Sequence, residues 1–283
     1  MTPREIIARA PRVPTPSAPV LRLLRLLGQP FVDAEGITAI VRQDAALTAK
    51  LLAFCNAAAT GLPTRVASVD EAVFYLGHGE VQRLVISLGL GTAVRPKLPG
   101  YLMPEGALWQ HTLFTAHLTS KVLGRAEGLC TEPELAYTAG LLHDLGKLVF
   151  SHALDQPTRD AVRAQVQQHH LALVQAEHRV LGTDHAEVGA RLLEDWNLPE
   201  VIVTAVAHHH RPTAGGRPSL AAVVHVADLL AHEAGSAPGM DGLAVAVDEG
   251  ALVALNLSAD AMQELLMDAF DVAGEVDKLI SQT

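Results

Sequence analysis

The segment with the clearest chemical potential runs from Ala139 to Lys147 and contains the adjacent residues His143 and Asp144. Two neighbouring polar side chains at the end of an otherwise apolar helix are costly to bury unless they are paired or coordinated. A divalent metal ion would offset that cost, because imidazole and carboxylate groups are ligands for Zn, Fe and Mn. The pair alone is common by chance, so a purely structural role stays equally open.

Further histidines and an aspartate lie in separate predicted helices and could complete a metal site. His111 lies near the start of a long apolar helix, and His185 follows Asp184, whose residue type caps helix N-termini. Asp228 is a lone acid flanked by aliphatic residues and needs a partner if it is buried. Helices in a bundle can bring such residues to one inner site, as di-metal bundle proteins do.

The helix expected from Pro199 ends in three consecutive histidines, His208, His209 and His210. Consecutive residues of a helix point about 100° apart, so all three cannot face one metal ion without a change of backbone geometry. Spacing alone therefore does not decide which of the three would be ligands.

Three residues near these candidates each have two interpretations. Lys147, one turn after His143, could stabilise charge on a phosphate group, although a solvated lysine at a helix C-terminus is the simpler interpretation. His225 and His232 lie three residues before and four residues after Asp228 on one helical face, where either could orient the carboxylate. Ordinary, partly exposed side chains are the simpler interpretation for both histidines.

The composition favours a chain of packed helices. Hydrophobic residues make up 49% of the 283 residues and aromatic residues only 4%, so the apolar content is mostly Ala, Leu and Val. No stretch shows the period-two alternation of a strand, and we predict an all-α protein. Beyond the first 68 residues, helices are expected at 69–76, 80–94, 107–127, 131–144, 155–168, 171–181, 185–196, 199–210, 219–234 and from 258 to the C-terminus.

Local signals mark helix starts and one boundary between lobes. Asp44 can cap a helix, and Ser68 followed by Glu71 has the spacing of a capping box. The segment Arg95–Gly100 contains two prolines and interrupts the helical pattern. We therefore expect an N-terminal helical lobe over residues 1–100 and a second lobe, with the metal-site candidates, over residues 101–283.

Charge and cysteine content restrict the class of protein. With 31 acidic against 21 basic residues and a formal charge of -10, the chain has no basic footprint for direct nucleic-acid binding. No signal peptide is evident, and the apolar run around 84–94 is shorter than the roughly 20 residues of a membrane helix. We expect a cytoplasmic protein without membrane contact, in which Cys55 and Cys130 are reduced core thiols.

The order of these residues resembles a known superfamily. The run 141–147 with Asp228 far downstream is similar to the H…HD…D signature of HD-domain phosphohydrolases, and His185 with the later histidines resembles the additional ligands of the HD-GYP subgroup. The upstream half resembles the HDOD family of bacterial signalling proteins. This second resemblance is carried by Gln43–Leu52, Cys55–Asn56, Ser68–Val73 and Leu76–Gly77, and the whole covers roughly Pro11 to Leu230.

The resemblance implies an all-α fold in which an N-terminal helical lobe packs on an HD-like helical bundle. It implies a site for a divalent metal, with two ions of Fe, Mn or Zn, held by His111, His143, Asp144, His185, His209, His210 and Asp228. It also implies regulation rather than catalysis, because HDOD proteins are generally regarded as regulatory modules without demonstrated hydrolase activity.

One departure from the catalytic subgroup separates two hypotheses. After the paired histidines, cyclic-dinucleotide phosphodiesterases resemble one another in an acidic residue and a GYP-type loop, whereas this chain reads RPTAGGRP over residues 211–218. We therefore favour a signalling adaptor that binds a partner protein or a small nucleotide ligand between its lobes. The alternative is a phosphohydrolase acting on a nucleotide or cyclic dinucleotide, in which two ions activate water and Lys147 contacts phosphate. Homodimer formation stays open in either case.

Overall fold

The computed structural model describes residues 1–11, 13–27, 34–57, 60–62, 64–212, 217–236, 239–240 and 248–281. Within these ranges all longer elements are helical, and the extended pairing is an isolated bridge between Leu98 and Met103, so the all-α prediction is confirmed. The elements are α1 (Pro3–Ala8), α2 (Ala18–Leu26), α3 (Ala34–Arg42), α4 (Ala45–Cys55), α5 (Val69–Leu76), α6 (His78–Val94), the 3-10 helix η2 (Pro99–Tyr101), α7 (Ala107–Arg125), α8 (Pro133–Leu142), α9 (Leu145–Ala153), α10 (Gln156–His169), α11 (Leu173–Leu181), α12 (His185–Asp195), α13 (Glu200–His208), α14 (Leu220–Glu233), α15 (Glu249–Ala254) and α16 (Ala259–Ser281).

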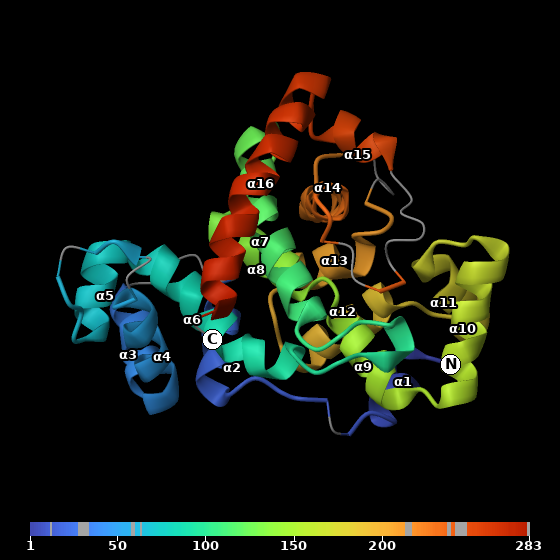
Figure 1. Ribbon diagram of the computed structural model, residues 1–283, viewed down its shortest axis with the longest axis horizontal. Coiled ribbons are helices and arrows are strands. Elements are labelled where there is room, and N and C mark those ends of the chain that lie inside the picture. The colour runs from blue at the N-terminus through green and yellow to red at the C-terminus, as the bar shows by residue number, and fades with distance from the viewer. Residues whose placement is uncertain are drawn as a thin grey trace.

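Helices α2 to α6 form the N-terminal lobe, drawn in blue and cyan in Figure 1. The Asp44 carboxylate accepts hydrogen bonds from the backbone N–H groups of Ala46 and Leu47, which satisfies two donors that the start of α4 leaves without helical partners. Ser68 caps α5 in the same way, through the N–H of Glu71. The reciprocal bond differs from the expected capping box, because the Glu71 carboxylate accepts from Ala67 rather than from Ser68.

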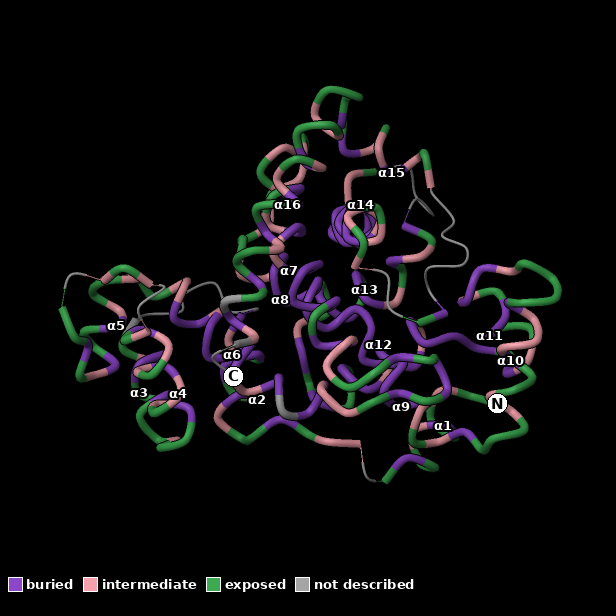
Figure 2. Tube along the Cα trace, in the orientation of Figure 1, coloured by how far each residue is buried: buried purple, intermediate pink, exposed green. Residues whose placement is uncertain are grey.

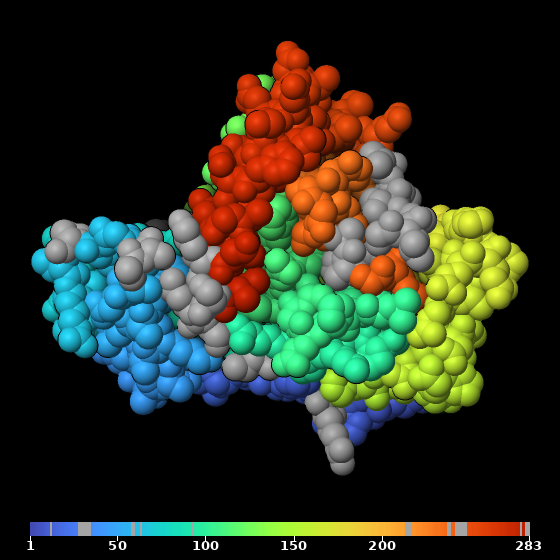
Figure 3. All heavy atoms as spheres, viewed as in Figure 1, coloured from blue at the N-terminus to red at the C-terminus, as the bar shows by residue number. Residues whose placement is uncertain are grey.

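The second lobe is built around α7, which packs against α8, α14 and α16. Along this helix the threonines and apolar residues are buried on nearly every side, as expected for a helix at the centre of a bundle. Figure 2 shows burial concentrated in α7, α8, α12 and α14, while α10 and α11 project at the end opposite the N-terminal lobe. In the space-filling view, α16 lies as a ridge across α7 (Figure 3).

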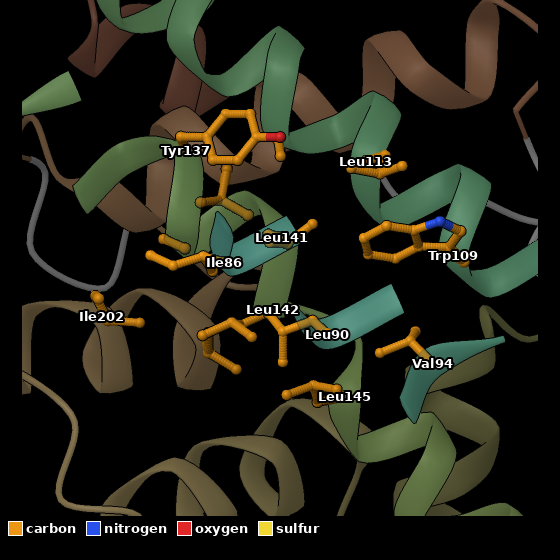
Figure 4. Packing of buried hydrophobic residues seen from close by; sticks show 14 of the residues in the cluster. Ile86, Leu90, Val94, Trp109, Leu113, Tyr137, Leu141, Leu142, Leu145 and Ile202 are labelled. Carbon is orange, nitrogen blue, oxygen red and sulfur yellow. The ribbon is translucent and has the colours of Figure 1, made fainter. Parts of the chain in front are cut away.

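Helix α6 joins the two lobes through a shared core. Figure 4 shows Ile86, Leu90 and Val94 of α6 in one buried cluster with Trp109 of α7 and residues of α8 and α9. Gly91 makes this approach possible, because a Cβ there would lie 3.1 Å from the Trp109 ring. Each fully buried leucine in such a core stabilises the fold by roughly 1.5–3 kcal/mol relative to an exposed one.

Several elements differ from the expectations. The predicted helix 131–144 ends at Leu142, and a separate helix, α9, begins at Leu145 after a break at His143 and Asp144. The N-terminal segment forms α1, which packs on α9 and α12 of the second lobe. The prediction for Cys130 is wrong, because this thiol is exposed between α7 and α8, whereas Cys55 is buried as expected.

Among the helices of the described part of the chain, none has both the length and the hydropathy that a membrane crossing requires. Residues 213–216, which belong to the segment that departs from the GYP-type loop, lie outside the described ranges.

Candidate metal centre

The break between α8 and α9 places the Asp144 carboxylate among four imidazole rings. One oxygen, Oδ2, lies 3.6 Å from His111 Nε2 and 3.4 Å from His143 Nε2. The other oxygen, Oδ1, lies 3.3 Å from His185 Nε2 and 3.9 Å from His209 Nε2. The carboxylate therefore faces two separate groups of nitrogen ligands with its two oxygens.

The first group of ligand atoms comes from α7, the end of α8 and α14. Oδ1 of Asp228 lies 3.1 Å from His111 Nε2 and 3.7 Å from His143 Nε2. Ligand atoms of His111, His143 and Asp144 lie within 4.8 Å of one another, and Asp228 joins this set through its contacts with His111 and His143. All four residues are buried, so these atoms are shielded from bulk water.

The second group comes from α12 and the end of α13. His210 Nε2 lies 2.8 Å from His185 Nε2, and the rings of His209 and His210 lie with their centroids 3.9 Å apart. Helix α13 ends at His208, which is exposed, and His209 keeps helical dihedral angles while it and His210 both approach His185. One ligand atom from each of His185, His209 and His210 lies within 4.8 Å of the others.

Backbone carbonyls orient the rings. Nδ1 of His143 lies 2.7 Å from the carbonyl oxygen of Gly140, and Nδ1 of His209 lies 2.7 Å from that of Val206. Nδ1 of His111 lies 2.8 Å from the carbonyl of Ser236. Because a carbonyl oxygen can only accept, Nδ1 is the protonated nitrogen in each ring, and Nε2 presents its lone pair to the centre.

The chemistry of these atoms fits a pair of metal ions. Nε2 of His111, His143 and His209, and Oδ1 of Asp144 and Asp228, are buried without a hydrogen-bond partner in the described part of the chain. Leaving each such atom unsatisfied costs roughly 1–3 kcal/mol. Lone pairs that face one another at these distances repel unless a proton or a metal ion lies between them, and an ion at each group would satisfy all five atoms.

Two functional residues were not among the predicted ligands. The carboxylate of Glu177 on α11 is fully buried and accepts hydrogen bonds from Nδ1 of His185 and from the hydroxyl of Tyr101, each at 2.7 Å. His232 lies with its Nε2 3.4 Å from Asp228 Oδ1. Glu177 has no sequence signal, whereas the spacing of four residues from Asp228 raised an orienting role for His232 only as the alternative to an ordinary, partly exposed side chain. His225 instead bonds the His209 carbonyl and the backbone N–H of Asp248.

Burial and neighbouring charges shift the pKa values of the candidate ligands in opposite directions. Burial alone would raise the pKa of Asp144, but His143 and Lys147 hold it well below its usual value. Burial lowers the pKa of His185, yet the Glu177 carboxylate outweighs this effect and raises it to about 10. Burial and the neighbouring imidazoles hold the pKa values of His209 and His210 well below the ordinary histidine value, so both rings are neutral ligands at pH 7.

Lys147 does not lie where the simpler interpretation placed it. It belongs to the first turn of α9, is 3% exposed, and its Nζ lies 2.5 Å from Asp144 Oδ2. The prediction of a solvated lysine at a helix C-terminus is therefore wrong. A contact with phosphate stays a prediction.

The comparisons with known proteins agree with this architecture. The model of the HDOD domain matches residues 13–212. An uncharacterised protein of Treponema pallidum is 29% identical over 211 residues, which are 72% of this chain and 39% of that protein. A cyclic di-GMP phosphodiesterase of Vibrio cholerae is 33% identical over 105 residues, which are 34% of this chain and 24% of the enzyme. The chain thus spans less than half the length of both curated relatives.

Solved structures show the same fold over nearly the whole chain. An HDOD domain protein of unknown function from Geobacter sulfurreducens has a TM-score of 0.76 at 24% identity, and the match covers 98% of this chain and 96% of that one. A protein of Shewanella amazonensis, provisionally named a phosphohydrolase, has a TM-score of 0.73 at 23% identity, covering 98% and 97%. Together with the domain match, these findings show that the chain belongs to the HDOD domain family.

Proposed function

We propose that this chain is a signalling module in which a closed pair of metal ions stabilises the HD-like lobe while a groove between the lobes binds a protein partner. The proposal rests on a contrast in solvent exposure between the buried candidate ligands and the open groove. The side chains of His111, His143, Asp144, His185 and His209 are at most 1% exposed, and that of Asp228 is 10% exposed. The seventh candidate ligand, His210, is half-buried. Closed coordination is typical of structural metal sites, whereas catalytic sites keep an open position.

The groove has a volume of about 780 Å³ and lies where α2, α3 and the start of α6 meet the N-terminal ends of α8 and α13. Leu135, Leu198 and Val201 give it an apolar part, and its three glutamates, Glu132, Glu134 and Glu200, outnumber its one arginine, Arg25. Carboxylates repel the phosphates of a nucleotide and attract cationic side chains. These features favour a polypeptide with basic residues over a small nucleotide ligand.

A specific observation favours the second candidate, a metal-dependent phosphohydrolase. The Asp144 carboxylate lies between the two ligand groups, and the ammonium of Lys147 lies beside it, where it could bind a phosphate oxygen. Two bound ions would supply an activated water and charge stabilisation for hydrolysis of a phosphoester. The named activity of the Vibrio relative belongs to the same reaction class.

Metal analysis and turnover distinguish the two functions. The purified protein, loaded with Mn²⁺, Fe²⁺ or Zn²⁺, is dialysed, and its metal content is measured by mass spectrometry. Hydrolysis of bis(p-nitrophenyl) phosphate and of cyclic di-GMP is then followed. Bound metal without turnover supports the signalling module, whereas metal-dependent turnover above a His143→Ala control would replace it with the phosphohydrolase.

The groove is tested with a labelled amphipathic helical peptide rich in lysine and leucine. We expect binding at low salt that weakens at high salt and on the combined replacement of Glu132, Glu134 and Glu200 by Gln. The matched control replaces the exposed acids Glu194, Glu233 and Asp260 with their amides. Equal effects of the two sets would contradict a partner site in the groove.

A further inference from the structure

His232 extends the first ligand group beyond the residues that the family signature supplies. It lies on α14 one turn after Asp228, and its side chain is 9% exposed. Its ring packs edge to face against the His111 ring, with centroids 5.3 Å apart. One ligand atom from each of His111, Asp228 and His232 lies within 4.8 Å of the others, so His232 forms a triad with two members of the first group.

We propose that His232 is a further ligand of the ion held by His111, His143, Asp144 and Asp228. The inference rests on the proposed metal centre and deepens it. With His232 the ion has five protein donors, so one fewer position remains for water or for a phosphate oxygen. This extra donor gives a chemical reason for a closed site in a chain whose other ligands match those of a hydrolase.

The distances favour a shared cation over a simple hydrogen bond between His232 and Asp228. The separation of 3.4 Å between Nε2 and Oδ1 is longer than the roughly 2.7–3.2 Å of a good N–H···O bond. Nε2 of His111 approaches the same oxygen to 3.1 Å, although its Nδ1 carries the proton. A nitrogen lone pair this close to a carboxylate oxygen is repelled by it unless a cation lies nearby.

The local geometry explains why the side chain points there. Residues four apart on a helix lie on one face, so Asp228 and His232 project together from α14. That face of α14 packs against α7, which carries His111. The position of His232 therefore follows from the same helix pair that positions two of the other ligands.

The test uses the full chain with Co²⁺, whose visible spectrum reports coordination number and ligand type. His232→Ala removes the donor, and His232→Asn keeps an amide that can hydrogen-bond Asp228 but is a poor ligand for these metals. His117→Ala is the matched control, because His117 lies on α7 with Nδ1 3.5 Å from Glu275 on α16. Chelator competition measures affinity, circular dichroism verifies folding, and added azide detects an open coordination position.

We expect both His232 variants to change the Co²⁺ spectrum, to bind azide that the wild type excludes, and to lose more affinity than the roughly 10–100-fold that a lost neighbouring hydrogen bond costs. The His117 control should match the wild type. If His232→Asn keeps the wild-type spectrum and affinity, the ligand assignment is overturned while the closed metal centre stands. If the wild type binds no metal, the His232 assignment and the proposed metal centre both fail. If the wild type hydrolyses phosphodiesters, only the signalling proposal fails.

Discussion

The buried Glu177 carboxylate accepts two hydrogen bonds from His185, one from the backbone N–H at 2.9 Å and one from Nδ1 at 2.7 Å. It therefore holds both the start of α12 and the ring whose Nε2 faces Asp144. A carboxylate behind a ligating histidine fixes the orientation of the ring and raises its basicity. Glu177 is in this sense a positioning residue for the proposed metal centre.

Glu177→Gln should weaken metal binding roughly 10–100-fold, because the amide orients His185 less well and adds no basicity. In the metal-free protein, the pKa of His185 should fall from its value of about 10, since the Glu177 charge is what raises it. Chelator competition and an NMR titration of the His185 ring measure these effects. Glu194→Gln, on the exposed side of α12, is the control, and equal affinities in the two variants would contradict the positioning role.

His143→Ala should lower both metal content and thermal stability. Binding of an ion to the folded state alone stabilises it by about 2.7 kcal/mol at a free concentration 100 times Kd. The variant should show a melting temperature that no longer rises with added Mn²⁺, as measured by differential scanning calorimetry. An unchanged response to metal would count against His143 as a ligand.

Lys147→Met should destabilise the metal-free protein by about 3–5 kcal/mol, because it leaves the buried Asp144 carboxylate without its ammonium partner. A bound ion neutralises the same carboxylate, so saturating metal should restore much of the loss. Urea unfolding with and without metal measures the difference. Lys121→Met, an exposed change on α7, serves as the control, and a loss equal in both metal states would show that Lys147 acts by packing alone.

Gly146→Ala should be destabilising by about 1–3 kcal/mol or more, because its Cβ would overlap the carbonyl oxygen of His185 where α9 packs on α12. Gly274 in α16 has open space around its Cβ position, so Gly274→Ala should instead stabilise the fold by up to about 1 kcal/mol. Denaturant midpoints compare the two. If both substitutions shifted the denaturant midpoint in the same direction, the close contact with the His185 carbonyl would not explain why position 146 is a glycine.

The metal-free protein should be most stable near pH 6.5. His209 and His210 have lowered pKa values in the folded protein, so their neutral rings contribute their full stability above the pKa of about 6.5 that histidine has in the unfolded chain. This contribution is lost as the pH falls. His185 has a raised pKa, so its charged ring contributes its full stability below about pH 6.5, and this contribution is lost as the pH rises towards about 10. Urea unfolding between pH 5 and 9.5 measures the curve. A free energy of unfolding that changes in one direction only would refute this balance.

Patterns among residues close together in the sequence predicted much of the fold. Asp44, Ser68 and Asp184 cap helices because a side-chain oxygen and the N–H groups it satisfies lie within three residues of each other. The same locality explains the failures. The prediction did not include α9, which begins at Leu145 and packs on α12, because no proline separates it from α8. Cys130 was misplaced because its short apolar stretch turned out to be a loop.

The sequence by itself determined the helical class, the family pattern and the set of histidines and aspartates that could bind metal, because residue types, periodicity and order are written along the chain. Only the tertiary structure decided that Asp144 lies between two ligand groups, that Glu177 lies behind His185, and that Lys147 is buried. Those relations join side chains from helices far apart in sequence, and the packing of α7, α9, α12 and α14 fixes their distances.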